Sequence, residues 1–140
     1  MRAVVQRVTS ATVTVEGRVV GAIKAGVLVY VGITHDDGAD DTAYVANKIA
    51  SLRVFDDADG RLSRSVRDAG GEVLLVPQFT LYGDCRRGRR PSFDKAAAPV
   101  AAKAVYEGLA DAVRGLGVPV RLGEFQAHMV VASNNDGPVT

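Results

Sequence analysis

Two short runs of almost entirely apolar residues, 27–33 and 72–76, constrain the fold of this chain most. Each has the length of a β-strand, and an apolar residue at nearly every position is typical of a strand buried on both faces. Residues 2–15 instead roughly alternate apolar and polar side chains and are rich in β-branched types, which predicts a further strand. Residues 16–18 supply a turn, and residues 19–23 predict the returning strand. The first third of the chain is therefore predicted to be a β-meander.

Helical spacing occurs in two segments. Val45, Ile49 and Leu52 recur at the period of an amphipathic helix and follow the acidic residues 36–41, whose carboxylates suit the amino end of the helix dipole. The second segment begins near Pro99, a residue suited to a first helical turn, and two glycines end it. Its apolar positions are Val105, Leu109, Ala112 and Leu116, and its terminating glycines are Gly115 and Gly117. Closing strands are predicted at residues 118–122 and 129–132.

The bulk composition is typical of one soluble domain. A chain of 140 residues is expected to form a single domain, residues 1–140, because one apolar core is efficient at this size. The single cysteine, Cys85, excludes an intrachain disulfide and favours a reducing compartment. No signal peptide is visible, and the longest apolar run, residues 25–33, is too short to span a bilayer. We therefore expect a soluble, cytoplasmic protein without a membrane partner.

Charged residues narrow the possible ligands. A net charge of +1 argues against a uniformly basic surface, so any contact with phosphate must come from a local cluster. One such cluster contains Arg86, Arg87, Arg89 and Arg90, although charge alone does not separate a phosphate site from a solvated loop. The acidic residues 56–60 lack the acidic side chain that an EF-hand loop needs at its last position, which favours a turn. No group of His, Cys and Asp residues has the sequence spacing of metal ligands, so we expect neither a metal nor a cofactor.

Two segments combine irregular backbone with polar side chains. The strand at residues 72–76 is stopped by Pro77, which cannot donate to a central ladder, and the polar loop 78–91 follows. A strand end of this kind exposes main-chain N–H groups without ladder partners, and these can receive a developing negative charge. Residues 133–137 are turn-rich, and the following Pro138 lowers the free energy of a cis peptide bond, although trans is the commoner form.

Together, the polar segments resemble the motifs of the D-aminoacyl-tRNA deacylases. The matching stretches are Gln-Phe-Thr-Leu at residues 78–81, Gly-Arg-Arg-Pro-Ser-Phe at 88–93 and Asn-Asp-Gly-Pro-Val-Thr at 135–140. The opening Val-Gln-Arg-Val at residues 5–8 also matches. Each motif is weak alone, but their order and spacing extend the resemblance over essentially the whole chain.

The resemblance implies a fold, an activity and an assembly. The fold is a mixed α+β domain with a mostly antiparallel, barrel-like sheet and two main helices packed outside, in a homodimer. The activity is hydrolysis of the ester bond of D-aminoacyl-tRNA. Gly137-Pro138, in the cis form, is implied to reach into the partner subunit's pocket, where its carbonyls hold the substrate's amino group and exclude an L side chain. Glycyl-tRNA should also be accepted. Arg7 is the position implied to hold the Gly-Pro carbonyls, a task that suits its rigid fork of donors.

For catalysis, the resemblance places the oxyanion donor at the main-chain N–H of Phe79. Thr80 is the candidate nucleophile, but a threonine hydroxyl is inert without a base, and neither His35 nor His128 has the spacing of a triad. We therefore prefer a mechanism in which main-chain groups and the substrate's 2′-hydroxyl activate water, while Gln78 and Thr80 orient it. The implied pocket for the terminal adenosine and the acyl group contains Phe125, Ala127 and Met129.

Other interpretations of these residues remain open. From residue type alone, Arg7 could be an edge-strand charge and Phe125 a core residue. Pro77 stands where the family usually has serine, Gln126 stands where it usually has glycine, and relatives continue beyond the position of Thr140 with a short apolar strand. Two further functions are therefore kept: an RNA-end-binding module that has lost catalysis through Pro77, and a structural protein that retains only the dimeric sheet.

Overall fold

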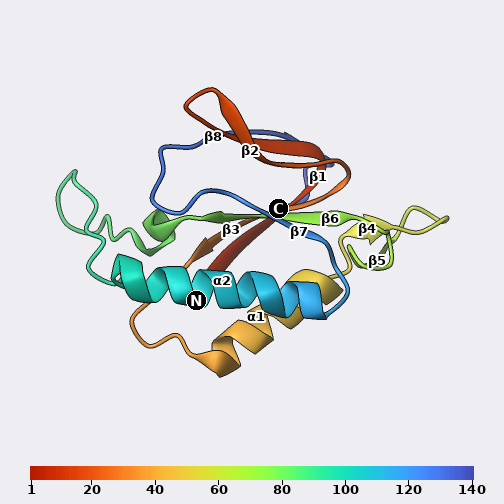
Figure 1. The fold of residues 1–140 in the computed structure, drawn as a ribbon. Helices are drawn as coiled ribbons and strands as arrows, with labels where there is room; N and C mark the ends of the chain where they lie inside the picture. The colour runs from red at the N-terminus through yellow and green to blue at the C-terminus, as the bar shows by residue number, and fades with distance from the viewer.

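A six-stranded sheet forms the frame of the molecule, and both α-helices lie against one of its faces (Figure 1). The computed structural model describes all 140 residues. The helices are α1 (Ala39–Ser51) and α2 (Pro99–Gly115), and a 3₁₀ turn, η1, spans Phe79–Tyr82. The sheet contains β1 (Arg2–Val15), β2 (Arg18–Ile23), β3 (Gly26–Gly32), β6 (Glu72–Pro77), β7 (Val120–Leu122) and β8 (Val130–Asn135), and a separate hairpin contains β4 (Phe55–Asp56) and β5 (Leu62–Arg64). The expected α+β fold with two main helices is confirmed.

The predicted β-meander is wrong, because β1 lies between β2 and β3 in the strand order and pairs with both of them. β2 and β3 run in succession along β1 in one antiparallel register, so that Val13 faces Gly21 and Val5 faces Val29. β8 pairs with the other edge of β1. The chain therefore does not reverse between β2 and β3. Instead it bends at Gly26, where a Cβ would collide with the main chain of β6 and only glycine permits the close approach.

The sheet curls into a nearly closed barrel. β1 pairs antiparallel with β2, β3 and β8, whereas the β3–β6 and β6–β7 pairs are parallel. β2 and β7 are the two end strands of the order β2-β1-β3-β6-β7, and they come close to each other. A Cβ on Gly21 of β2 would stand 2.5 Å from the carbonyl oxygen of Leu122 in β7. Arg18 and Glu124 form an ion pair between the same two regions, with an N–O distance of 3.3 Å. The expected mostly antiparallel, barrel-like sheet is confirmed.

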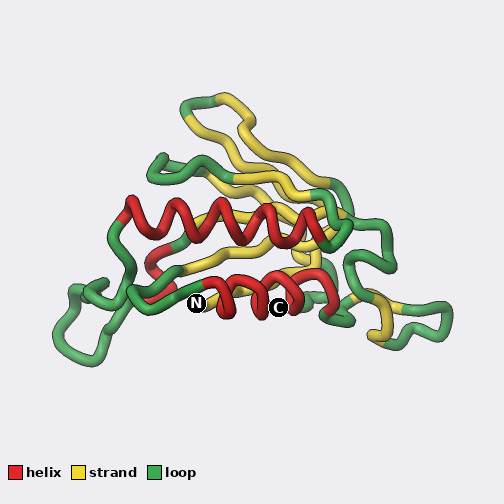
Figure 2. Tube along the Cα trace, turned by 60° about the horizontal axis from the view of Figure 1, so that its bottom comes forward, coloured by secondary structure: helices red, strands yellow, loops and turns green.

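Two apolar clusters bury the two faces of the sheet. The two helices, which lie alongside each other (Figure 2), cover one cluster that includes Val27 and Val29 of β3. A second cluster, on the opposite face, joins Leu28 of β3 to Leu74 and Val76 of β6. Alternate residues of β3 and β6 thus enter opposite clusters, which is why both strands are apolar at nearly every position. The predicted burial of these strands on both faces is confirmed.

The ends of several elements differ from the sequence prediction. α1 begins at Ala39, and Asp40 and Asp41 of the predicted acidic stretch lie in its first turn, where carboxylates favour the helix dipole. β8 continues to Asn135, so residues 133–135, predicted as turn, are strand, because their pairing with β1 extends the sheet. No helix of the structure has the length and apolar character needed to cross a membrane.

The acidic residues 56–60 lie in the β4–β5 hairpin, which projects from one end of the molecule (Figure 1). The carboxylate of Asp57 accepts hydrogen bonds from the N–H groups of Arg61 and Asp59 and from the hydroxyl of Ser63. The bond from Arg61, then that from Ser63, holds the pKa of Asp57 below its usual value. Because the turn itself uses this carboxylate, the turn interpretation is confirmed.

Tyr106 links α2 to the sheet beside the end of β6. Its side chain is 2% exposed, and its hydroxyl donates a hydrogen bond to the carbonyl of Leu75 at 2.8 Å. The carbonyl of Gly123 lies 3.4 Å from the same hydroxyl. Burial raises the pKa of Tyr106. One side chain therefore joins the helix, β6 and the segment that follows β7.

Replacing Tyr106 with phenylalanine should lower the free energy of unfolding by about 1 kcal/mol, because a buried hydrogen bond is lost. Urea denaturation measures this as a lower midpoint with an unchanged slope. Because its pKa is raised in the folded state, Tyr106 stabilises the fold fully below about pH 10, and this contribution is lost at higher pH. Stability should therefore fall less steeply above about pH 10 in Tyr106→Phe than in the wild type. Tyr44→Phe is the matched control at an exposed position, and an unchanged midpoint in Tyr106→Phe would contradict this role.

Candidate active site

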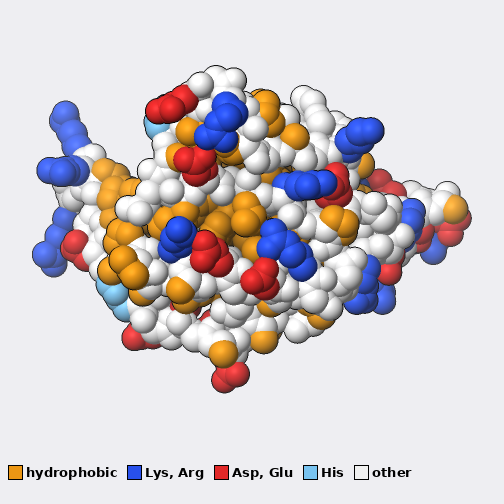
Figure 3. All heavy atoms as spheres, in the orientation of Figure 1, with side chains coloured by type: hydrophobic (Ala, Val, Ile, Leu, Met, Phe, Trp, Pro, Cys, Tyr) orange, Lys and Arg blue, Asp and Glu red, His pale blue; other side chains and the backbone are white.

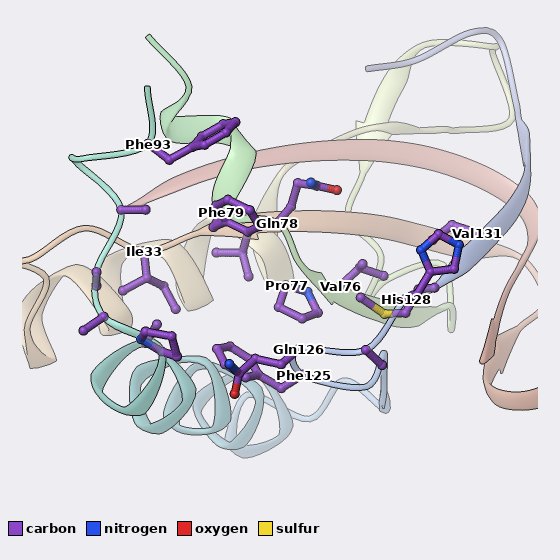
Figure 4. Close-up of a pocket in the computed structure, with 18 residues that line it drawn as sticks. Ile33, Val76, Pro77, Gln78, Phe79, Phe93, Phe125, Gln126, His128 and Val131 are labelled. Atoms are coloured by element: carbon purple, nitrogen blue, oxygen red, sulfur yellow. The ribbon is translucent and has the colours of Figure 1, made fainter. Parts of the chain in front are cut away.

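An apolar cavity of about 660 Å³ opens where β6 ends, between η1, the start of α2 and the segment that precedes β8 (Figure 4). Of the 18 residues that line it, 13 are hydrophobic. In the orientation of Figure 1, hydrophobic side chains also gather on the surface above α2 (Figure 3). A cavity of this size with few polar groups is typical of a site for a small molecule or a nucleotide.

Five of the residues predicted to form the site line this cavity. Gln78 and Phe79 come from the segment after β6, whereas Phe125, Ala127 and Met129 come from the segment between β7 and β8. Figure 4 shows Phe79 and Gln78 on one side of the space and Phe125 on another. The structure thus brings together two segments that are distant in the sequence, while the predicted Thr80, Arg7, Gly137 and Pro138 do not line the cavity.

Two adjacent main-chain N–H groups at the end of β6, those of Phe79 and Thr80, have no hydrogen-bond acceptor within the chain. β6 ends at Pro77, and the first N–H groups of the following turn η1 have no preceding carbonyl in the turn to bind. The N–H of Leu81, in contrast, already donates to the carbonyl of Gln78. The fold therefore leaves two neighbouring donors available beside an apolar cavity, which is the arrangement that stabilises an oxyanion.

The hydroxyl of Thr80 is bound to a neighbouring amide rather than to a base. Nε2 of Gln78 donates a hydrogen bond to Oγ1 of Thr80 at 2.5 Å, and no carboxylate, imidazole or amine bonds to this hydroxyl. A threonine hydroxyl without a general base is a poor nucleophile. Gln78 and Thr80 thus form a polar pair, and each side chain keeps further donors and acceptors that this bond does not use.

Aromatic rings form part of the cavity wall. Phe79 and Phe93 pack edge to face, with ring centroids 5.1 Å apart and an interplanar angle of 72°. Phe125 packs against the buried Tyr106, with centroids 5.9 Å apart. Phe79 is 58% exposed, so one large apolar ring at the cavity remains open to solvent. Such a wall suits the flat face of a nucleic-acid base.

Pro77 and Gln126, at which the sequence resemblance implied a departure from the family, both line the cavity and change its wall in different ways. Pro77 contributes a ring without a hydroxyl or an N–H group. Gln126 has a φ of 62°, in the left-handed region that costs a residue with a side chain about 1–2 kcal/mol and that glycine adopts readily. The side chain of Gln126 adds an amide to a mostly apolar wall.

Residues 85–91, which we call the arginine loop, project beyond η1, and their basic side chains stand out at one end of the molecule (Figure 3). Paired main-chain hydrogen bonds between Asp84 and Ser92 hold the base of the loop. Arg86 folds back onto Asp84, with Nε–O distances of 2.9 and 3.0 Å, and this contact holds the pKa of Asp84 well below its usual range. The other three predicted phosphate ligands, Arg87, Arg89 and Arg90, are exposed and form no ion pair within the chain.

The end of the chain is held against β1. The peptide bond between Gly137 and Pro138 is cis, the form that the resemblance implied. The main-chain N–H of Arg7 donates to the carbonyl of Val139 at 3.0 Å, and the carbonyl of Arg7 accepts from the N–H of Asp136 at 2.9 Å. The side chain of Arg7 is buried and donates to the carbonyl of Asp136, one residue before Gly137. Arg7 is thus a buried cation on a central strand and not an edge-strand charge.

Several residues at the site were not predicted from the sequence. Phe93 could have been found, because it ends the motif at residues 88–93. Ile33, after β3, and residues 96–99, before and at the start of α2, also line the cavity, but their apolar side chains are typical of ordinary core and helix positions. His128 lines the cavity as an exposed side chain. No three His, Cys, Asp or Glu side chains of the chain form a group able to hold a metal ion.

Comparison with known proteins agrees with the resemblance. A family model described as D-Tyr-tRNA(Tyr) deacylase matches residues 4–140. The D-aminoacyl-tRNA deacylase of Thermus aquaticus is 59% identical over 140 residues, which cover 100% of this chain and 92% of that protein. The D-aminoacyl-tRNA deacylase of Heliobacterium modesticaldum is 57% identical over 140 residues, which cover 100% of this chain and 93% of that protein.

Solved structures share the fold. The c-Myc DNA unwinding element binding protein has a TM-score of 0.94 at 40% identity, over 99% of this chain and 95% of that one. A structure described as a probable eukaryotic D-amino acid tRNA deacylase has a TM-score of 0.83 at 18% identity, over 96% of this chain and 94% of that one, and shows the fold alone. With a family match over nearly its whole length and relatives above half identity, the chain belongs to the D-Tyr-tRNA(Tyr) deacylase family.

Proposed function

We propose that the chain hydrolyses the ester bond of D-aminoacyl-tRNA and releases free tRNA and the D-amino acid. The observation that carries this proposal is the pair of unpartnered N–H groups at Phe79 and Thr80, beside an apolar cavity. Family membership supports the same activity, because curated relatives that cover the whole chain are D-aminoacyl-tRNA deacylases. We infer that the protein acts in the cytoplasm on charged tRNA.

In the proposed reaction, water attacks the carbonyl carbon of the ester, and the carbonyl oxygen becomes an oxyanion that accepts a hydrogen bond from the N–H of Phe79. The water loses its proton with help from the substrate's 2′-hydroxyl, and Gln78 and Thr80 orient the reacting groups. Collapse of the tetrahedral intermediate breaks the bond to the ribose 3′-oxygen, which takes up a proton. Removing one hydrogen-bond donor from an oxyanion site typically lowers kcat on the order of 100-fold or more.

Chiral selection is proposed to operate across a homodimer. Gly137 and Pro138 are exposed and lie outside the cavity of their own chain, which supports their reaching a cavity of the partner subunit. There their main-chain carbonyls would hold the substrate's α-amino group, with no side chain on Gly137 to limit which D-residue fits. An L side chain would meet this backbone wall, so rejection rests on shape. Glycine has no side chain to reject, so glycyl-tRNA is a proposed second substrate.

The terminal adenosine and the acyl group are assigned to the cavity itself. Phe125, Ala127 and Met129 form one part of its wall, and the exposed ring of Phe79 forms another. Aromatic and thioether side chains interact favourably with the face of a base, and this interaction does not depend on which base it is. The arginine loop is assigned to the phosphates that precede the adenosine, because Arg87, Arg89 and Arg90 form no ion pair within the chain.

A binding role without turnover is the alternative. Pro77 at the site removes a hydroxyl and an N–H that its usual counterpart, serine, would supply. The relative with 40% identity carries a name that describes binding to a DNA element. The free N–H groups at Phe79 and Thr80 favour turnover, because a binding module has no need of donors for a developing charge. A purely structural role is the second alternative.

The wild-type chain should release D-tyrosine from D-tyrosyl-tRNA at least about 100-fold faster than it releases L-tyrosine from the L form. Glycyl-tRNA should also be hydrolysed. The free amino acid released over time, with the tRNA in excess, measures all three rates. Binding of D-tyrosyl-tRNA without release would support the binding module, and neither binding nor release would support a structural role. Equal rates on the D and L forms would contradict chiral selection.

The mechanism predicts opposite outcomes for two neighbouring substitutions. Phe79→Pro removes the main-chain donor and should lower kcat on D-tyrosyl-tRNA by about 100-fold or more. Thr80→Ala removes a hydroxyl that has no base and should retain measurable turnover, about tenfold below the wild type or better. Single-turnover rates at saturating enzyme separate chemistry from binding.

Phe79→Ala is the control for the first substitution, because it loses the ring but keeps the N–H. Circular dichroism shows whether Phe79→Pro still folds. A Thr80→Ala variant that binds the substrate with unchanged affinity but has no turnover would overturn the water mechanism in favour of a threonine nucleophile.

Removing the free charges of the arginine loop should weaken the binding of tRNA without changing the chemical step. In the triple alanine variant of Arg87, Arg89 and Arg90, KM should rise, kcat should stay near that of the wild type, and the slope of log affinity against log salt should fall by about 2. A variant with alanine at Lys24, Arg61 and Arg67 removes the same charge from other exposed positions and is the control. Equal salt slopes in the two variants would show that the loop is only a solvated segment.

A further inference from the structure

We propose that Asp56, in the β4–β5 hairpin, is a positioning residue that orients Arg7 and, through Arg7, the Gly137-Pro138 segment. This inference rests on the proposed function, because it assigns Asp56 to the support of the chiral-selection segment. Asp56 belongs to none of the motifs that resemble the family, and it lies outside the cavity.

The guanidinium of Arg7 is the point at which the hairpin meets the rest of the site. Its side chain is only 9% exposed. From Nη1 it donates to the carbonyl of Val54 at 3.0 Å and to Oδ2 of Asp56 at 3.2 Å. These two acceptors lie just before β4 and within it, so one side of the planar guanidinium is held by the hairpin.

The other side of the same guanidinium faces the chain end. Nε of Arg7 lies 3.2 Å from the carbonyl oxygen of Asp136 and 3.2 Å from its carboxylate oxygen Oδ2. Nη2 lies beside Gly137, at 3.3 Å from the point where a Cβ would stand. A planar group held along one edge has a fixed direction at the other edge, so the hairpin contacts define where Nε and Nη2 can bind.

Charge reinforces this arrangement. A buried guanidinium needs acceptors on every side, and here two carboxylates, one from the hairpin and one from the chain end, flank the cation. Asp56 is 49% exposed, so its contribution is geometric more than a large gain in stability. Without Asp56, only the Val54 carbonyl remains on the hairpin side, and the guanidinium is free to turn toward Asp136 and shift the chain end.

The neighbouring acidic residues of the hairpin have other partners. The carboxylate of Asp57 is bound within the turn, by the N–H groups of Asp59 and Arg61. Asp59 lies near Arg61 at 4.0 Å, and both side chains are exposed. Asp59 is therefore a matched control for Asp56, because it has the same charge in the same hairpin but no contact with Arg7.

The first measurement does not depend on enzyme activity. Amide hydrogen exchange followed by NMR reports how firmly the chain end is held against β1. The two reporting amides are those of Asp136, which donates to the Arg7 carbonyl, and of Arg7, which donates to the Val139 carbonyl. In Asp56→Ala the exchange of these two amides should be faster by roughly 2- to 30-fold, the range expected for loss of a coupled contact. Asp56→Asn keeps an acceptor oxygen and should show a smaller increase, whereas Asp59→Ala should leave both amides unchanged.

The second measurement tests the consequence for selection. The ratio of kcat/KM on D-tyrosyl-tRNA to that on L-tyrosyl-tRNA should fall by a similar factor in Asp56→Ala, recover in part in Asp56→Asn, and stay at the wild-type value in Asp59→Ala.

Unchanged exchange in Asp56→Ala would overturn the positioning role, and so would faster exchange of every amide, which is the result of general destabilisation. If the wild type hydrolyses no aminoacyl-tRNA, the proposed function fails, while the exchange rates still decide whether Asp56 positions the chain end. Faster exchange with an unchanged ratio would remove the link to selection.

Discussion

Burial of β3 and β6 on both faces is the constraint on which the rest of the structure depends. Because alternate side chains of these strands enter opposite apolar clusters, one face must be covered by helices and the other by the curl of the sheet. Glycines make the curl possible, since the main chain passes Gly21 and Gly26 too closely for any side chain. Two apolar strands thus determine both layers of the molecule.

The same burial gives the end of β6 its chemistry. After β6 stops at Pro77, the N–H of Gln78 still bonds to β3, but the N–H groups of Phe79 and Thr80 have no ladder to join. Around an apolar cavity, water screens a main-chain donor less, so its interaction with a developing negative charge is stronger than in bulk water. A site of this design needs no ionised side chain. The hydroxyl of Thr80 agrees with this, because its one hydrogen-bond partner is the uncharged amide of Gln78.

Local sequence patterns predicted most of the fold, because strand and helix periods depend on neighbours in the chain. They failed between β2 and β3, where the break near Gly26 is visible in the sequence but the unchanged direction of the chain is not. At the site, a motif indicated Gln78 and Phe79, and the family resemblance implied Phe125, Ala127 and Met129; the structure brings these five residues together. Ile33 and Asp56 could not be predicted, because an apolar residue after a strand and an aspartate near a turn are common, and only tertiary packing places them.

In the proposed homodimer, the position of Arg7 suits a division of hydrolysis and selection between the two subunits. Each chain holds its cavity at the end of β6, while Arg7 fixes the exposed Gly137-Pro138 segment outside that cavity. In the proposed homodimer, a two-fold axis makes one self-complementary contact supply both cavities with a selecting segment. A segment that enters a partner's site must already be rigid, because rejection of an L side chain by shape fails if the wall can move aside. In the mechanism proposed above, the buried guanidinium, held by the hairpin on one side and by Asp136 on the other, would provide that rigidity without placing any side chain at the chiral centre.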